Sequence, residues 1–143
     1  MITQFVEANR FLSNFYPCQV EFEGDVYATV EHAYQAAKTV DPRQRLEIRN
    51  LPRPGDAKRM GNMLRPREDW PDVKLQIMET LLRQKFAKPQ FRNRLLATGN
   101  QELVEGNSWG DRFYGMVYGP DGKWRGENHL GKLLMKIRGG DSI

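Results

Sequence analysis

The chain has 143 residues, of which 39% are hydrophobic, 28% are charged and 10% are aromatic, with a formal net charge of +4. These proportions are typical of globular proteins and exclude an intrinsically disordered chain. No stretch approaches the ~18 consecutive apolar residues of a membrane span, and the first residues lack the charged and apolar regions of a secretory signal. We therefore expect one globular domain over residues 1–143.

The chain contains one cysteine, Cys18, and two histidines, His32 and His129. A single cysteine excludes an intramolecular disulfide and is typical of a reducing, cytoplasmic setting. So few nitrogen and sulfur ligands argue against a metal site, and the sequence has no nucleotide-binding or zinc motif. We expect no metal, no cofactor and no membrane partner. The basic balance tolerates an anionic ligand, such as a phosphate or a nucleic acid, but does not require one.

The first part of the chain combines an aromatic segment with a hairpin pattern. Residues 11–18 are rich in aromatic side chains, which indicates an irregular buried segment. Polar and apolar residues alternate over 19–22, a turn follows at 23–25, and a second strand returns at 26–27. This pattern predicts a small β-hairpin.

A helix is expected over residues 30–38, with Thr29 as its N-cap. Its apolar and small residues share one face of the helix, and three polar residues, Glu31, Gln35 and Lys38, share the other. The common interpretation of such a pattern is an amphipathic helix whose polar face is exposed to water.

Helix signals dominate the rest of the chain. Asp41 followed by Pro42 starts a helix that runs to about residue 50, and Pro54 starts another that runs to residue 64. Further helical patterns cover residues 71–87 and 89–98. Asn128 is expected to cap a final helix.

The strand signals in the second half are short. We expect a strand at 103–104 and a second hairpin whose strands, 116–118 and 123–125, flank Gly119–Gly122. No alternation of strands and helices long enough for a doubly wound sheet is present. The predicted fold is α+β, a predominantly helical single domain with short β-hairpins.

Two segments carry side chains suited to chemistry. Glu31 and Lys38 stand two helical turns apart, roughly 10 Å along the axis, which is too far for an ion pair but suits a sugar-sized ligand lying along one wall. His32 lies at the start of the same helix, where a histidine is more often a hydrogen-bonded packing residue than a catalyst. Residues 103–115 combine polar side chains with three aromatic residues and several glycines, a composition that offers a stacking surface, or forms a glycine-rich turn around a buried tryptophan. The start of the final helix can receive a phosphate, as any helix N-terminus can.

Taken together, the chain resembles the NADAR (YbiA-like) family of small cytoplasmic N-glycosidases from about residue 10 to residue 138. The resemblance rests on motifs spread along this range: Leu12–Phe15, Val30–Lys38, Arg59–Gly61, Trp70, Leu82–Phe86, Leu95–Thr98, Leu103–Glu105, Trp109–Asp111 and Asn128–Met135. The pattern Glu-His-x-x-Gln-x-x-Lys, followed far downstream by Trp-Gly-Asp and Asn-x-Leu-Gly, is a specific combination.

The resemblance implies an N-glycosyl hydrolase that cleaves the bond between ribose C1′ and a nitrogen, and the two histidines and one cysteine predict that it needs no metal. It implies one of two substrate classes: ADP-ribose attached to guanine in nucleic acid such as DNA, or phosphorylated ribosylamino-pyrimidine intermediates of riboflavin synthesis. The residues that it marks as catalytic are Lys38, Glu31 and Asp111. Those that it marks as substrate-binding are Asn14, Phe15, His32, Tyr34, Gln35, Trp109, Gly110 and Asn128.

Two mechanisms fit these residues. In one, Glu31 and Asp111 act alone, one moving a proton to the departing nitrogen and the other stabilising positive charge at C1′. In the other, which we prefer, a neutral Lys38 amine forms a Schiff base with the opened sugar. Tyr34 and Trp109 are expected to stack on the ligand. A non-catalytic ADP-ribose- or nucleotide-binding module would use the same residues, and release of free base or ribose separates it from an enzyme.

Overall fold

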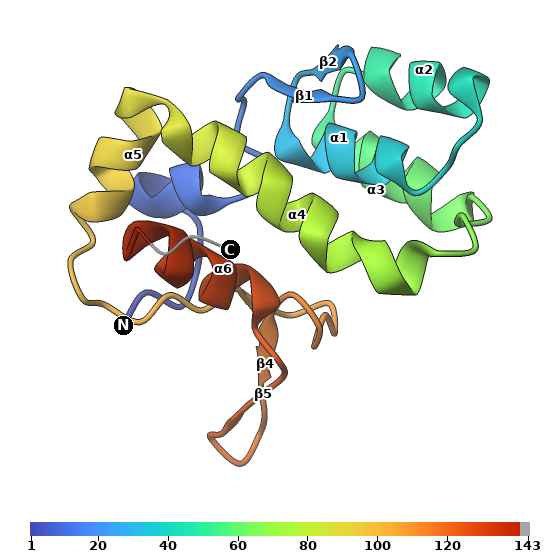
Figure 1. Ribbon diagram of the computed structural model, residues 1–143. Helices are drawn as coiled ribbons and strands as arrows, with labels where there is room; N and C mark the ends of the chain where they lie inside the picture. Colours follow the sequence, from blue (N-terminus) through green and yellow to red (C-terminus); the bar gives the residue numbers. More distant parts are fainter. Residues whose placement is uncertain (141–143) are drawn as a thin grey trace. The chain divides into compact units, whose positions relative to one another are not determined.

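The structure is a computed structural model that describes residues 1–140 (Figure 1). The chain packs as two compact units, one formed by Asn14–Ala87 and the other by Met1–Ser13 together with the chain from Lys88 onward. Helices predominate and the strands are short, which confirms the predominantly helical α+β class. A single domain over residues 1–143 stays a prediction.

The unit formed by Asn14–Ala87 begins with the first predicted hairpin. Strands β1 (Val20–Phe22) and β2 (Asp25–Tyr27) pair antiparallel, with Val20 opposite Tyr27. The two linking residues, Glu23 and Gly24, have φ angles of 47° and 92°. Two successive residues with positive φ form the turn whose twist matches paired strands, and a glycine at the second position lowers its cost. The hairpin prediction is confirmed.

Helix α1 (Val30–Ala37) lies at the centre of this unit. The hydroxyl of Thr29 accepts a hydrogen bond from the His32 N–H at 3.0 Å, so the predicted N-cap is confirmed. Helix α1 packs against α2 (Pro42–Asn50), α3 (Pro54–Met63) and α4 (Trp70–Ala87).

All eight residues of α1 are buried. An exposed polar face on this helix is therefore wrong for Glu31 and Gln35, because the helices around α1 cover that face as well.

The three surrounding helices agree with their sequence signals. The Asp41 carboxylate accepts from the Arg43 N–H at 2.9 Å, and Pro42 and Pro54 occupy the first turns of α2 and α3. Proline fits there because the first helical N–H groups have no intrahelical acceptor. Helix α4 begins at Trp70, one residue before its expected start.

The second unit contains the 3₁₀ helix η1 (Glu7–Leu12), α5 (Pro89–Leu96), three strands and α6 (His129–Arg138). Strand β3 (Gly106–Asn107) pairs parallel with β4 (Met116–Tyr118), which pairs antiparallel with β5 (Trp124–Arg125). The second hairpin is confirmed. The strand expected at 103–104 is not: Leu103 makes only an isolated parallel bridge with Ile2, and strand β3 starts at Gly106.

The start of α6 differs from the sequence prediction. Asn128 has φ 53° and makes no side-chain capping bond. The carbonyl oxygens of Phe113 and Tyr114 accept from the N–H groups of His129 and Leu130, each at 3.0 Å. Two of the N–H groups that a phosphate would use at this helix end therefore already have partners within the chain.

Within residues 1–140, none of the helices has the length and apolar content needed to cross a bilayer.

Candidate active site

The predicted site residues divide between the two units. The Asn14–Ala87 unit holds Asn14, Phe15, Glu31, His32, Tyr34, Gln35 and Lys38, and the second unit holds Trp109, Gly110, Asp111 and Asn128. Each group is described by itself below.

Glu31 is buried on the first turn of α1, with 8% of its surface exposed. Its main-chain N–H donates to the Asn14 carbonyl oxygen at 3.1 Å, which ties the helix start to the preceding segment. Its carboxylate oxygen Oε2 accepts a hydrogen bond from the Gln35 amide at 3.0 Å, one turn further along α1. A carboxylate held in this way is available for proton transfer in a fixed orientation.

Lys38 is half-buried at the C-terminal end of α1. Burial lowers the pKa of its amine below the ordinary value for lysine, and the positive charges of Lys58 on α3 and Lys74 on α4 lower it further, while the Glu31 carboxylate opposes the shift. A lowered pKa increases the fraction of neutral amine at physiological pH, and the neutral amine is the nucleophile.

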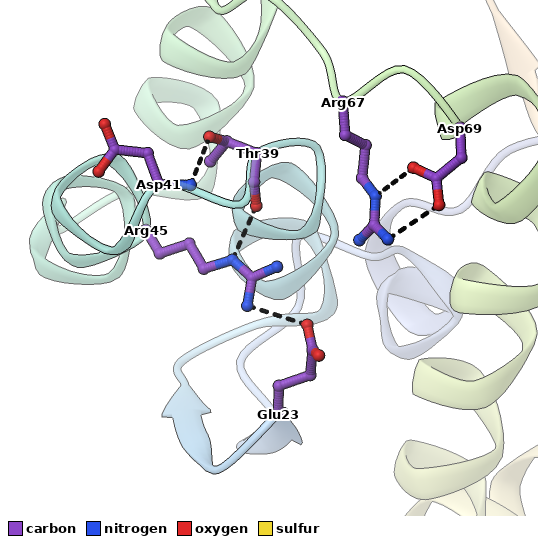
Figure 2. A network of polar contacts seen from close by, with 6 residues as sticks. All are labelled: Glu23, Thr39, Asp41, Arg45, Arg67 and Asp69. Carbon is purple, nitrogen blue, oxygen red and sulfur yellow. Dashed lines mark hydrogen bonds and ion pairs between the residues drawn. The ribbon is translucent and has the colours of Figure 1, made fainter.

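The chain around Lys38 is held by hydrogen bonds and ion pairs. Figure 2 shows the network made by Glu23, Thr39, Asp41, Arg45, Arg67 and Asp69. The main-chain N–H of Arg67 donates to the Lys38 carbonyl oxygen at 2.7 Å. The Arg67 guanidinium binds both carboxylate oxygens of Asp69 at 2.5 and 3.0 Å. Arg45 donates to the Thr39 carbonyl oxygen at 2.8 Å and reaches Glu23 at 2.9 Å. These contacts fix the main chain on the C-terminal side of the lysine.

His32 is 1% exposed and both of its ring nitrogens have partners. Nε2 lies 2.8 Å from the Leu51 carbonyl oxygen and Nδ1 lies 2.7 Å from the Thr29 hydroxyl. Since a carbonyl only accepts, Nε2 carries the proton in the neutral ring, and Nδ1 accepts from the hydroxyl. In the structure, His32 thus joins α1 to the residue that follows α2.

The aromatic residues of this group have different surroundings. Tyr34 is buried and its ring centroid lies 5.0 Å from that of Trp70. Phe15 is 39% exposed. The side-chain oxygen of Asn14 is buried and has no hydrogen-bond partner among the described residues, while the amide nitrogen donates to the Met78 sulfur at 3.5 Å. A buried acceptor without a donor is a common feature of sites that bind a polar ligand or a water.

In the second unit, Asp111 shapes the loop that carries it. Its Oδ1 accepts from the N–H groups of Phe113 and Tyr114, each at 3.0 Å. The Asn107 side chain binds the main chain of Asp111 in both directions, at 2.8 and 2.9 Å. One oxygen of this carboxylate therefore has a structural task in the loop.

Trp109 is 62% exposed, so the alternative of a buried tryptophan is wrong. It lines a hollow of about 590 Å³ together with Phe5, Tyr118 and Trp124. Gly110, beside Trp109, has φ +88°, a conformation that favours glycine over other residues. This hollow has the aromatic lining expected of a surface that binds a planar ring.

Asn128 is 5% exposed, and its side-chain amide binds main-chain groups of the Leu103–Glu105 segment. Its Oδ1 accepts from the Glu105 N–H at 3.0 Å, and its Nδ2 donates to the Leu103 carbonyl oxygen at 3.0 Å. Gly131 is needed beside it, since a Cβ there would lie 2.1 Å from the Leu103 oxygen and 2.4 Å from the Asn128 amide nitrogen. In the structure both polar atoms of the Asn128 side chain bind main-chain groups.

A family model described as the NADAR domain matches residues 3–140. The chain belongs to the NADAR domain family. It is 38% identical over 133 residues to the protein named N-glycosidase YbiA from Escherichia coli, covering 88% of this chain and 78% of that protein. It is 36% identical over 135 residues to a riboflavin biosynthesis protein of Vibrio vulnificus, of which it spans only 35%.

The NADAR fold is also found among solved structures. The NMR structure of E. coli YbiA matches 97% of this chain and 82% of that chain, with a TM-score of 0.79 and 35% sequence identity. The predicted family and the fold class are thus both confirmed.

Three residues of this NADAR domain near the predicted group had no role assigned from sequence. Lys58 and Lys74 act on Lys38 from helices distant in sequence, and no local pattern distinguishes them from other surface lysines. Gly61 lies inside α3 against Gln35. The signal for Gly61 was a glycine within a helical pattern, because such a glycine usually has a packing reason.

Within residues 1–140 no cluster of three or more His, Cys, Asp or Glu side chains is arranged to hold a metal ion.

Proposed function

We propose that the chain is an N-glycosidase that hydrolyses the bond between ribose C1′ and a nitrogen, without a metal ion and in the cytoplasm. The observation that carries the proposal is the pair on α1: a buried, oriented Glu31 and a Lys38 amine whose pKa is lowered. Membership of the NADAR family supports it, as does the N-glycosidase name carried by relatives at about 40% identity.

Lys38 is the nucleophile in this proposal. The nitrogen on C1′ forms a C1′=N bond as the C1′–O4′ bond breaks, and O4′ takes a proton. The neutral Lys38 amine adds to C1′, and the departing nitrogen leaves with its electron pair and gains a proton, which forms a C1′=N bond to the lysine. Water then adds to C1′ and the lysine leaves as an amine. One water is consumed, and the products are the free nitrogen compound and the sugar.

Glu31 moves the proton from the attacking amine to the departing nitrogen in this scheme. Asp111, in the other unit, keeps the charge-stabilising role expected from sequence, for which it has the oxygen that Phe113 and Tyr114 do not bind. Asn14 supplies an acceptor oxygen for a sugar hydroxyl, and its lack of a hydrogen-bond donor among the described residues supports that role. Within the Asn14–Ala87 unit, Phe15 and Tyr34 are the proposed ligand contacts, and within the other unit these are Trp109 and Gly110.

Two substrate classes remain for this activity, and both carry phosphate near the ribose. Riboflavin biosynthesis names among the relatives support phosphorylated ribosylamino-pyrimidines. The net charge of +4 supports ADP-ribose on guanine in nucleic acid. Lys58 and Lys74, whose charges act on Lys38, suit an anionic substrate of either class.

The experiment is reductive trapping with both substrates in parallel. Borohydride added during turnover should reduce the imine to a stable sugar adduct on the peptide that contains Lys38. Lys38→Ala should lose both the adduct and turnover, and Lys38→Arg should do nearly as badly, because a guanidinium stays protonated. Lys132→Arg, a change of an exposed lysine on α6, is the matched control.

Three results would contradict the proposal or part of it. Turnover without an adduct would replace the lysine mechanism with the carboxylate-only one. Tight binding without release of free base or sugar from either substrate would identify a non-catalytic binding module. Loss of turnover in a strong chelator, restored by a divalent ion, would overturn metal independence.

A further inference from the structure

Gln35 lies one helical turn after Glu31 on α1 and contacts its carboxylate directly. It is 4% exposed, and its amide nitrogen donates to Glu31 Oε2 at 3.0 Å. Its Oε1 is buried and has no hydrogen-bond partner among the described residues. The Gln35 amide nitrogen therefore binds the Glu31 carboxylate, and the amide oxygen points away from it.

The acceptor end of Gln35 is pressed against α3 at Gly61. A Cβ added at Gly61 would lie 1.8 Å from Gln35 Oε1 and 2.6 Å from Gln35 Cδ, far inside any real contact distance. Glycine inside a helix is less favourable than alanine and usually has a packing reason. The missing side chain at Gly61 is therefore what lets the amide reach Glu31.

The orientation of the Gln35 amide follows from chemistry. Turning it over would set its oxygen against the Glu31 carboxylate, two acceptors in contact, and would break the bond to Oε2. Only one orientation joins the two side chains, and in that orientation the oxygen occupies the space above Gly61.

From these contacts we infer that Gln35 and Gly61 are positioning residues for Glu31. Gly61 fixes the Gln35 side chain, and Gln35 holds Glu31 Oε2, which sets the orientation of the carboxylate. This inference rests on the proposed function for the role of Glu31 as proton carrier. It gives Gln35 a different task from the substrate contact that the family resemblance implies.

The test is a double-mutant cycle in which kcat is compared between variants, under conditions where the chemical step limits the rate. Gly61→Ala should lower kcat by about 10- to 100-fold, as expected for a misplaced catalytic group, with little change in KM. Gln35→Ala should lower kcat by a similar factor. In the Gln35→Ala background the second change, Gly61→Ala, should cost much less, because the two atoms that clash most, Gln35 Oε1 and Cδ, are gone and only the Cβ contact at 3.1 Å remains.

Gly55→Ala is the matched control on the same helix. Gly55 also lies in α3, but a Cβ there would meet nothing within 4 Å. This variant should keep wild-type kcat and KM. Losses that multiply in the double variant, or an equal loss in Gly55→Ala, would overturn the inference.

A readout independent of activity separates this inference from the proposed function. The ¹³C signal of the Glu31 carboxyl group is titrated in wild type and in Gln35→Leu, which removes the donor at similar volume. Because a hydrogen bond to the ionised form favours that form, the midpoint should move up by about one pH unit in Gln35→Leu. An unchanged midpoint contradicts the positioning role, even in a protein that turns over. A shifted midpoint supports it, even where neither substrate reacts.

Discussion

The amine nitrogen of Lys85 lies 5.9 Å from the centre of the Tyr16 ring, and Lys85 is fully buried. The Phe86 ring lies close as well, with its centroid 5.3 Å from the same nitrogen. Burial lowers the Lys85 pKa to about 7, and the Cys18 side chain acts in the opposite direction. A buried amine is therefore built into the Asn14–Ala87 unit, apart from the lysine assigned to catalysis.

This amine should make stability depend on pH. In the unfolded chain Lys85 binds its proton up to about pH 10.4, whereas in the folded chain it releases it near pH 7. Between these values the unfolded state binds more protons, so the free energy of unfolding should rise as pH increases from 7 toward 10. Urea denaturation across this range measures the slope.

Lys85→Met should remove most of this slope and raise stability at pH 7 and below, where the wild-type amine must carry its charge at a buried position. The gain should be on the order of a few kcal/mol at most, since methionine fills a similar volume. Lys88→Met, an intermediate-exposure lysine three residues later, is the control and should keep the slope. An unchanged slope in Lys85→Met would contradict the assignment.

Lys58 and Lys74 should set the pH dependence of the reaction through Lys38. Their positive charges lower the pKa of the Lys38 amine. Removing either charge should raise that pKa, and the rising limb of the kcat profile should move to higher pH, because only the neutral amine attacks.

The comparison uses Lys58→Met and Lys74→Met against Lys132→Met, and kcat is followed from pH 6 to pH 10. If the lysines also hold substrate phosphate, KM rises in the first two variants at every pH. A rising limb that stays in place in both variants would show that burial alone sets the state of Lys38.

Trp109 should contribute to ligand binding and little to stability. Because 62% of its surface is exposed, Trp109→Ala should change the unfolding free energy by less than about 1 kcal/mol. Loss of a stacking surface should weaken substrate binding by about 5- to 100-fold, equivalent to ~1–3 kcal/mol. Calorimetry with the inactive Lys38→Ala protein measures binding without turnover.

Leu96→Ala is the control for Trp109, since Leu96 is 51% exposed on α5 in the same unit. It should bind substrate like wild type. A Trp109→Ala protein that unfolds early and shows no selective binding defect would assign the tryptophan to packing instead.

Asn128 should be a stability residue of its unit. Asn128→Ala removes both bonds of its amide to the Leu103–Glu105 segment, leaves two main-chain groups without partners and places alanine at φ 53°. A loss of about 2–4 kcal/mol in unfolding free energy is expected. Asn100→Ala, a change at an exposed position, should cost almost nothing. A stable Asn128→Ala protein with weakened substrate binding would instead support the ligand contact.

Several elements were determined by sequence alone, because their signals act within a few residues. Thr29 caps α1 through its own hydroxyl, and Asp41 with Pro42 starts α2. Glu23 and Gly24 form the turn of the first hairpin. The positions of Glu31 and Lys38 on one helix follow from the same local rules, so the sequence located the candidate chemistry and its family.

Contacts between distant segments decided the rest. The burial of Glu31 and Gln35 depends on helices that cover α1, and the space that Gln35 needs comes from Gly61, 26 positions later. Burial lowers the pKa of Lys38, and positive charges on α3 and α4 lower it further, against the Glu31 carboxylate. The Asn128 side chain does not form the N-cap bond that the sequence predicts, because its amide binds main-chain groups of Leu103 and Glu105 instead. Helical periodicity tells which side chains share a face, but only packing decides whether that face meets water, another helix or a charge.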